Sequence, residues 1–368
     1  SNDSVVTVNS GVAYPTGNGV ATIVVRIGEQ EAHIPVEVSG FEQPDPVSFQ
    51  YETLVALSKH DCNSGACHGS PSGKGGFRLS LRAYDKVLDT ETLIREFYNR
   101  RTNVEQPEKS LLLQKPVMEV AHGGGRRLKK DDLSYQLLRD WIGEGLKVDP
   151  EDAPECVKLE VYPPGGILKR PAHTQQLLVL AHFSEGSVRD VTDVASFSSS
   201  DDAVASVNAA GLVVGNDRGE AAILARYLDR IETTHLTFLK EIPGFAWTDE
   251  PENNYIDQHV FDKLEQLKIS PAELCSDDEF VRRVYLDVIG LLPSMEESAA
   301  FVADTDPEKR SKLIDQLLDR PEYAEFWALK WSDLLRLNNK SVTNEGVHKF
   351  RRWNVASIRD NMPYDQFV

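Results

Sequence analysis

Asp61-Cys62-Asn63-Ser64-Gly65-Ala66-Cys67-His68-Gly69 is the stretch that decides how the first half of this 368-residue chain is interpreted. Two cysteines followed at once by a histidine are typical of sites where both thiols hold a haem covalently and the imidazole binds its iron. The usual spacer is C-x-x-C; here the small, flexible residues Ser64-Gly65-Ala66 allow a longer spacer to loop outward. The sequence therefore predicts one covalent c-type haem, tethered by Cys62 and Cys67, with His68 as the proximal iron ligand.

Other uses of these residues remain open. A zinc site needs four nitrogen or sulfur ligands, so the cluster would have to recruit Cys156 and Cys275, which lie far along the chain. A disulfide between Cys62 and Cys67 is an alternative in an exported protein, but it leaves His68 unexplained. Cys156 and Cys275 either pair with each other or stay free thiols.

Length and composition limit the classes of protein. A chain of this length is expected to form two to four domains. Hydrophobic residues make up 40% and charged residues 27%, which is ordinary for a globular protein. No stretch approaches the roughly 18 apolar residues of a membrane helix. The net charge of −18 argues against binding to nucleic acid or anionic lipid over the whole chain.

An internal repeat brackets the cysteine motif. Residues 1–9 return in altered form at residues 200–208, and Gly19-Val20-Ala21-Thr22-Ile23 returns as Gly219-Glu220-Ala221-Ala222-Ile223. Alternating β-rich runs separated by turn residues predict β-sandwiches over residues 1–41 and 155–241. These segments resemble bacterial immunoglobulin-like domains of group 2, and residues 1–41 correspond to the latter part of such a domain. The resemblance implies spacer or adhesive modules.

The segment between the repeats, residues 46–149, is predicted to be helical. A first helix is expected from Val47 to Lys59, and a last helix is expected to begin after Asp131 or Asp132. The last helix carries an apolar stripe of Leu133, Leu137 and Trp141, widened by Leu138 and Ile142.

The rest of this segment carries a resemblance. Gly75-Gly76-Phe77-Arg78-Leu79, Pro107-Glu108-Lys109-Ser110-Leu111, His122-Gly123-Gly124-Gly125 and Trp141-Ile142-Gly143-Glu144-Gly145 follow the cysteine motif. With that motif they resemble the cytochrome-c-like modules of large secreted planctomycete proteins. The resemblance implies an all-α fold in which the first and last helices cross above the haem.

The distal iron ligand is suggested by the same resemblance. Related modules carry a Met-Pro-Pro segment where this chain has His122-Gly123-Gly124, so His122 is the expected sixth ligand. Met118 is the rival because a thioether also binds haem iron, and a five-coordinate iron is the third option. Ligation by His68 and His122 predicts a low-potential, low-spin centre. His60 is expected at the surface, and Arg126 or Arg127 is expected to pair with a haem propionate.

Residues 252–368 have the pattern of amphipathic helices. Ser276-Asp277-Asp278-Glu279 and Ser294-Met295-Glu296-Glu297 are predicted capping boxes, and Trp327, Trp331 and Trp353 are predicted core anchors. Phe280-Val281-Arg282-Arg283-Val284-Tyr285-Leu286-Asp287 and Met362-Pro363-Tyr364-Asp365 resemble a helical domain of unknown function that accompanies the planctomycete cytochrome modules. In that family the domain continues beyond the residue corresponding to Val368.

Together these features predict a multidomain protein with β-sandwiches, an all-α haem domain and a C-terminal all-α domain. Covalent haem is attached outside the cytoplasmic membrane, so a periplasmic, extracellular or cell-surface location is expected. The predicted function is electron transfer with a redox partner protein or an adjoining domain. A haem enzyme with an open distal face and a surface-binding protein with a structural haem are the alternatives, so the sequence leaves open whether the chain is an enzyme.

Overall fold

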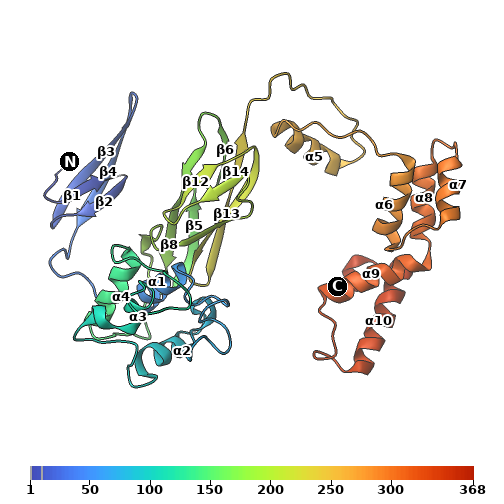
Figure 1. Cartoon of the computed structure of the whole chain (residues 1–368). Helices are drawn as coiled ribbons and strands as arrows, with labels where there is room; N and C mark the ends of the chain where they lie inside the picture. Colours follow the sequence, from blue (N-terminus) through green and yellow to red (C-terminus); the bar gives the residue numbers. More distant parts are fainter. Residues whose placement is uncertain (1, 10) are drawn as a thin grey trace. The chain divides into compact units, whose positions relative to one another are not determined.

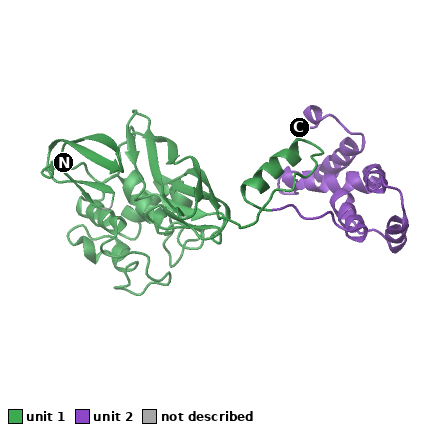
Figure 2. Cartoon of the chain, turned by 90° about the horizontal axis from the view of Figure 1, so that it is seen from above, with its two compact units in different colours: residues 1–269 green, residues 270–368 purple. Residues whose placement is uncertain are grey.

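A computed structural model describes residues 2–9 and 11–368 of the chain. The chain divides into two compact units, Ser1–Ile269 and Ser270–Val368 (Figure 2). The first unit contains antiparallel β-strands and helices, and the second is built from helices (Figure 1). The predicted mixture of α and β structure with a helical C-terminal region is therefore confirmed.

The internal repeat has the same strand pairing in both copies. The first copy contains β1 (Val6–Asn9), β2 (Val12–Pro15), β3 (Gly19–Ile27) and β4 (Gln30–Val38). The second contains β11 (Ala205–Val207), β12 (Leu212–Gly215), β13 (Gly219–Tyr227) and β14 (Arg230–Leu239). Gly19 pairs with Val38 in one copy and Gly219 with Phe238 in the other, so the register of this hairpin is preserved at an offset of 200 residues.

The second β-region is larger, because further strands flank its repeat. They are β5 (Cys156–Tyr162), β6 (Gly165–Lys169), β7 (Thr174–Gln176), β8 (Leu178–Phe183), β9 (Val188–Asp190) and β10 (Ser196–Ser199). The sheet orders are β10-β13-β14-β6, β11-β12-β7 and β5-β8-β9. Alternate residues of β8 and β13, such as Val179, Ala181, Ile223 and Ala225, are fully buried, which is the period expected for strands with one face in a core.

The regular elements of residues 46–149 are helices, although most of the segment is irregular. A continuous helix runs through η1 (Phe49–Thr53) and α1 (Leu54–Lys59), and α4 (Leu133–Gly143) is the last helix of the segment. Their aromatic rings meet, since the ring centroids of Phe49 and Trp141 lie 5.4 Å apart. Shorter elements lie between them: η2 (Leu81–Ala83), α2 (Lys86–Thr90), η3 (Glu91–Arg95), η4 (Pro107–Lys109) and α3 (Leu111–Gln114).

The predicted stripe of the last helix is only partly buried. Leu138, Trp141 and Ile142 have no exposed surface, whereas Leu133 is 44% exposed. Asp132 is the residue before the helix, but its carboxylate accepts a hydrogen bond from the Lys129 N–H (2.7 Å) and not from the first helical turn. The buried face of α4 therefore follows Leu138 and Ile142, one position after the predicted line of Leu133, Leu137 and Trp141.

The helical segment and the second β-region share one core. The Tyr227 hydroxyl donates to the Tyr51 carbonyl (2.9 Å), and the Tyr51 hydroxyl accepts from the Cys156 N–H (3.1 Å). The Tyr51 ring also packs edge-on against Phe183, with centroids 5.0 Å apart. Buried tyrosines usually satisfy their hydroxyls in this way. The first helix of the segment is thus packed directly on the β-region.

The helices toward the C-terminus begin with α5 (Tyr255–Gln266), which belongs to the first unit. The second unit contains α6 (Asp277–Ile289), α7 (Met295–Ala303), α8 (Lys309–Leu318), α9 (Pro321–Leu334), α10 (Asn344–Arg359) and α11 (Tyr364–Phe367). Its core is formed by Val281, Val284, Tyr285, Ile289, Phe301, Leu313 and Leu317.

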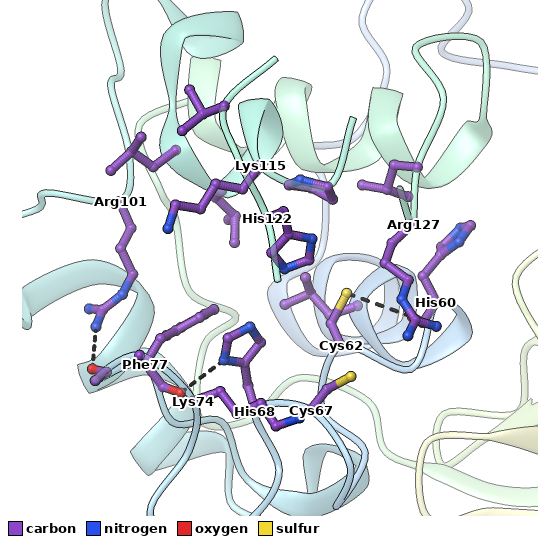
Figure 3. A pocket seen from close by; sticks show the side chains of 18 of the residues that line it. His60, Cys62, Cys67, His68, Lys74, Phe77, Arg101, Lys115, His122 and Arg127 are labelled. Carbon is purple, nitrogen blue, oxygen red and sulfur yellow. Dashed lines mark hydrogen bonds between the residues drawn. The ribbon is translucent and has the colours of Figure 1, made fainter. Parts of the chain in front are cut away.

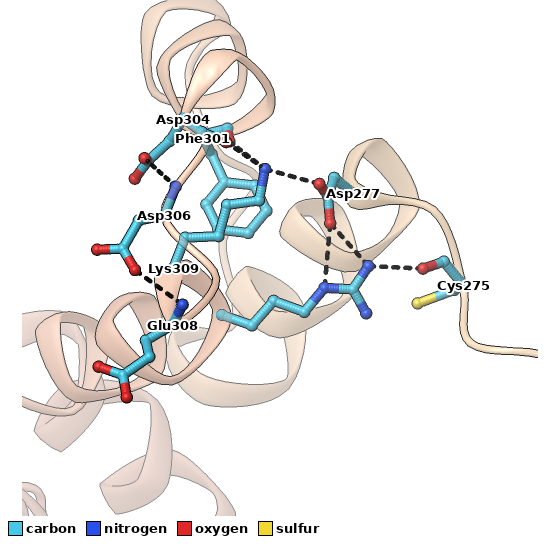
Figure 4. A network of polar contacts seen from close by, with 8 residues as sticks. Cys275, Asp277, Phe301, Asp304, Asp306, Glu308 and Lys309 are labelled. Carbon is cyan, nitrogen blue, oxygen red and sulfur yellow. Dashed lines mark hydrogen bonds and ion pairs between the residues drawn. The ribbon is translucent and has the colours of Figure 1, made fainter.

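One of the two predicted capping boxes is confirmed. Ser294 accepts from the Glu297 N–H (3.1 Å) while Glu297 accepts from the Ser294 N–H (2.7 Å). The prediction at Ser276 is wrong, because its side chain makes no capping bond. The neighbouring Asp277 instead pairs with Lys309 and Arg310, each at 2.7 Å (Figure 4). These ion pairs lower the pKa of the Asp277 carboxyl, with Lys309 the larger cause.

The predicted tryptophan anchors are less buried than expected. Trp327 is half-buried and donates its indole N–H to the Val288 carbonyl (3.1 Å). Trp331 is also half-buried, and Trp353 is 41% exposed. Trp353 stacks on Phe367, with ring centroids 5.4 Å apart. The core of this unit is therefore formed by aliphatic residues together with Tyr285 and Phe301, and the three tryptophans are not among its buried members.

Candidate functional site

The cysteine motif forms a closed loop directly after α1. The Cys62 N–H donates to the Leu57 carbonyl (2.9 Å), and the His68 N–H donates back to the Cys62 carbonyl (3.0 Å). Gly69 lies so close to Asn63 that a Cβ on it would be 2.0 Å from the Asn63 carbonyl oxygen. The loop can therefore close only with glycine at position 69.

The four-residue spacer loops outward only in its second half. Gly65 and Ala66 are exposed, as predicted, whereas Asn63 is 1% exposed. The Asn63 amide donates to the Ser58 hydroxyl (2.7 Å), which ties the loop back to the helix. The longer spacer is thus accommodated by one buried residue and an exposed tip.

The four predicted site residues meet at one cavity of about 470 Å³. Cys62, Cys67 and His68 line it from the loop, and His122 lines it from a segment 54 residues later (Figure 3). The volume lies within the range of about 300–1,000 Å³ that is usual for cofactor and ligand sites. Apolar side chains form much of the wall: Leu57, Phe77, Leu111, Leu112, Pro116, Val120 and Leu128.

The two histidines face one another across the cavity (Figure 3). The ring centroids of His68 and His122 lie 6.4 Å apart, and the ring planes differ by 14°. His68 Nδ1 is 3.0 Å from the Phe77 carbonyl oxygen, and His122 Nδ1 is 2.7 Å from the Gly125 carbonyl oxygen. Because a carbonyl only accepts, each Nδ1 carries the hydrogen, which leaves the Nε2 lone pair of each ring free to bind a metal.

The glycines after His122 hold its ring in place. A Cβ on Gly124 would lie 2.9 Å from His122 Cε1 and 3.3 Å from Nε2, whereas a Cβ on Gly123 would meet nothing within 4 Å. Gly125, whose carbonyl accepts from His122, has φ +71°, a conformation that favours glycine. The imidazole therefore packs against a backbone that has no room for a side chain at position 124.

Burial changes the protonation of the site residues. Burial raises the pKa of the Cys62 thiol to about 12, and the neighbouring Cys67 adds to the effect. Burial likewise lowers the pKa of His68, against the opposing effect of its bond to Phe77. Near neutral pH the site therefore presents a neutral Cys62 thiol and a neutral His68 imidazole.

Two residues near the motif lie in other places than the sequence suggested: Met118, the rival distal ligand, and His60, the expected surface residue. Met118 is 44% exposed and is not among the cavity-lining residues of the described chain. His60, expected at the surface, is half-buried and lines the cavity. Burial lowers the pKa of His60.

The charged residues that line the cavity are all basic. In the part of the chain that the structure describes, its lining includes five cations and no carboxylate: Lys74, Arg100, Arg101, Lys115 and Arg127. Of the two predicted propionate partners, Arg127 lines the cavity and Arg126 does not. A negatively charged ligand is therefore favoured in a chain whose net charge is −18.

Arg101 also links the loops that form the wall of the cavity. It donates to the carbonyls of Thr92 (2.9 Å) and Gly76 (3.0 Å), pairs with Glu96 (2.9 Å), and lies 4.6 Å above the centre of the Phe77 ring. Its role is to join the loops that carry these residues. Arg100, Lys115 and Lys74 are exposed and remain available to a ligand.

Lys74, Lys115 and the Arg101 contacts were missed from the sequence. Lys74 precedes Gly75-Gly76-Phe77, and a basic residue beside a glycine pair before an aromatic one is a weak signal. Lys115 directly follows α3, and nothing in its neighbourhood marks it. These residues reach the site through loop packing, which spacing along the chain does not report.

The cysteines and histidines of the described chain form neither a disulfide nor a metal-binding group of three or more side chains. All four cysteines are free thiols, including Cys156, which is buried. Over residues 2–9 and 11–368 no group of three or more His, Cys, Asp or Glu side chains is arranged to hold a metal ion. What the cavity offers is two thiols, two facing imidazoles, apolar walls and a basic lining, and these fit a flat apolar metal complex with acidic substituents.

Known proteins resemble the other end of the chain. Residues 255–368 match the family described as PSCyt2, a protein of unknown function (DUF1549). The predicted resemblance of this helical region to a domain of unknown function is thereby confirmed. No curated protein matches the chain. Among the helices that the structure describes, none has the length and apolar character needed to cross a membrane.

Proposed function

We propose that residues 46–149 bind one covalent haem c and transfer electrons. In this proposal Cys62 and Cys67 are the tethers, His68 is the proximal iron ligand and His122 is the distal one. The haem supplies a one-electron couple at its iron. The neighbouring residues bind it, orient it and restrict what reaches it.

The observation that carries the proposal is the pair of facing imidazoles. A metal between them needs two bonds of about 2 Å to nitrogen, and a centroid separation of 6.4 Å leaves room for these bonds between the inner edges of the rings. Both Nδ1 atoms are held by backbone carbonyls of Phe77 and Gly125. Such outer hydrogen bonds orient ligand histidines and raise their basicity. This arrangement supports saturated iron, and hence electron transfer rather than binding of a substrate at the iron.

The thiols support covalent attachment. Cys62 and Cys67 line the same cavity as His68. If haem is bound, these two thiols would hold it through thioether bonds, each made by adding the S–H across a vinyl group of the haem. The exposed cations Lys74, Arg100 and Lys115 line this cavity, which supports the proposal that basic side chains pair with the propionates.

Two histidine ligands also set the direction of the potential. A thioether ligand raises the haem potential, so replacing it by imidazole lowers it. We therefore propose a low-spin, low-potential centre. The β-regions are proposed to be immunoglobulin-like modules of an exported protein, at the cell surface or in the periplasm, with a partner protein or an adjoining domain as the redox partner.

The test is expression of the chain together with a c-type haem maturation system. The expected product is red, shows a haemochrome spectrum in alkaline pyridine, and keeps its haem in acid acetone. Cys62→Ala with Cys67→Ala should lose covalent haem. A colourless protein with unmodified mass would refute the proposal.

A second measurement tests the distal ligand. His122→Ala should become high-spin and bind carbon monoxide at once, while His235→Ala, in an exposed position of β14, should keep the low-spin spectrum. An unchanged low-spin spectrum in His122→Ala removes His122 from the iron. Immediate binding of carbon monoxide by the unmodified protein would instead favour a haem enzyme with an open distal face.

A further inference from the structure

A second cavity, of about 370 Å³, lies where the helical segment meets the second β-region. Lys59 and Arg82 line it from the helical side, and Arg226 of β13 lines it from the sheet. Residues 59–62 form a wall between the two cavities, because Lys59 and Asp61 line this one while His60 and Cys62 line the first. No residue lines both cavities in the described chain, so they are separate sites.

Two of the three cations in this cavity already have partners. Arg82 pairs with Asp61 at 2.8 Å. The Lys59 ammonium donates to the carbonyl oxygens of Asp193 and Ala209, the latter at 2.9 Å. Lys59 is thus fixed in place by neutral acceptors and its charge is not cancelled by direct contact with a carboxylate.

Arg226 is the cation without a partner. It is half-buried, and among residues 2–9 and 11–368 its guanidinium makes no hydrogen bond or ion pair. Burial, and after it the like charge of Arg82, lowers its pKa. An unpaired, partly desolvated guanidinium is unfavourable, and it is stabilised by any anion that reaches it.

Hydroxyl groups stand beside this guanidinium. Ser196 of β10 pairs directly with Arg226 in the sheet, and Ser198 lies two residues further on the same face. Both serines line the cavity, and in the described part of the chain neither side chain makes a hydrogen bond. A guanidinium fork next to free hydroxyl donors is the donor set that recognises carboxylate, phosphate and sulfate oxygens.

We propose that this second cavity binds a small oxyanion, with Arg226 as its principal ligand and Ser196 and Ser198 as additional donors. The anion would neutralise a guanidinium that has no partner among the residues the structure describes. This site is independent of the haem proposal, because none of these residues contacts the first cavity.

The test is calorimetric titration of the whole purified chain with inorganic phosphate, sodium sulfate and sodium citrate in separate arms. Sodium chloride at matched ionic strength is the control for screening. At least one oxyanion is expected to bind saturably. The arm with the tightest binding shows whether the site prefers phosphate, sulfate or carboxylate.

Variants localise the binding. Arg226→Gln should weaken it roughly tenfold or more, since a charge-assisted bond is lost, and Arg226→Lys should keep part of it. Arg230→Gln, at the start of β14 and outside the cavity lining, is the matched control and should bind normally. Circular dichroism checks that each variant is folded. Absence of saturable binding in all three arms, or equal binding by Arg226→Gln and Arg230→Gln, overturns the proposal and leaves the haem assignment untouched.

Discussion

Replacing Gly124 by alanine tests whether the backbone beside His122 holds the distal imidazole in place. The new Cβ would lie 2.9 Å from His122 Cε1, whereas carbon atoms pack at about 3.5–4.0 Å. The ring must therefore move by roughly 0.6–1 Å. Such a movement also weakens the 2.7 Å bond from Nδ1 to the Gly125 carbonyl.

The size of the effect follows from packing energies. Overpacking costs about 1–3 kcal/mol in a packed core, and this range is the upper bound here because Gly124 is exposed and the contact is with the end of the His122 side chain. If that strain is relieved by displacing His122, the equilibrium between ligand-bound and displaced forms shifts by at most about 5- to 150-fold. Gly123→Ala should leave it unchanged, because its Cβ would meet nothing within 4 Å.

The assay is the absorption spectrum of the haem-loaded protein, with and without carbon monoxide. Gly124→Ala should show a larger fraction that is high-spin and binds carbon monoxide than Gly123→Ala does. Urea unfolding of both variants without haem gives an independent reading, since only Gly124→Ala carries the steric conflict. If both variants match the unmodified protein in spectrum and stability, the reasoning about this contact is wrong.

Two further predictions concern the core and the acid stability of the first unit. Trp141→Ala removes a fully buried ring and should lower the free energy of unfolding by about 3–5 kcal/mol. The control Leu133→Ala, on the exposed face of the same helix, should change this free energy by no more than about 0.5 kcal/mol. Equal losses for the two variants in urea denaturation would contradict the assigned buried face of α4. Glu160 accepts hydrogen bonds from Lys158 and from His182 (2.8 Å), which lower its pKa from 4.5 to about 2. Because the pKa of Glu160 is depressed in the folded protein, the stabilisation from this carboxylate is present above pH 4.5 and is lost as the pH falls toward about 2. The unfolding midpoint should therefore fall less steeply over this pH range in Glu160→Gln than in the unmodified protein. Identical slopes would show that the contacts of Glu160 with Lys158 and His182 contribute nothing to stability.

Several local features were predictable because they depend on a few neighbouring residues. The helix expected from Val47 to Lys59 and observed over residues 49–59, the repeated β-strands and the Ser294 capping box follow from apolar period, turn glycines and cap chemistry. The shared register of the two hairpins is seen only in the structure. The predicted cap at Ser276 does not form, because its side chain makes no capping bond. The Asp277 carboxylate beside it pairs with Lys309 and Arg310 of another helix, and local cap propensity does not report such long-range partners.

The sequence by itself determined the chemical identity of the candidate site: two thiols and a histidine at fixed spacing, and a second histidine before three glycines. Only the tertiary structure decided that His68 and His122 face each other, that Met118 lies outside the cavity, and that Lys74 and Lys115 line it. The physical reason is that spacing along the chain restricts the distance in space only between residues a few positions apart. Whether residues 54 positions apart lie close together depends on how the intervening loops pack. The unpaired guanidinium of Arg226 is decided in the same way, because the charges around it come from two separate parts of the chain.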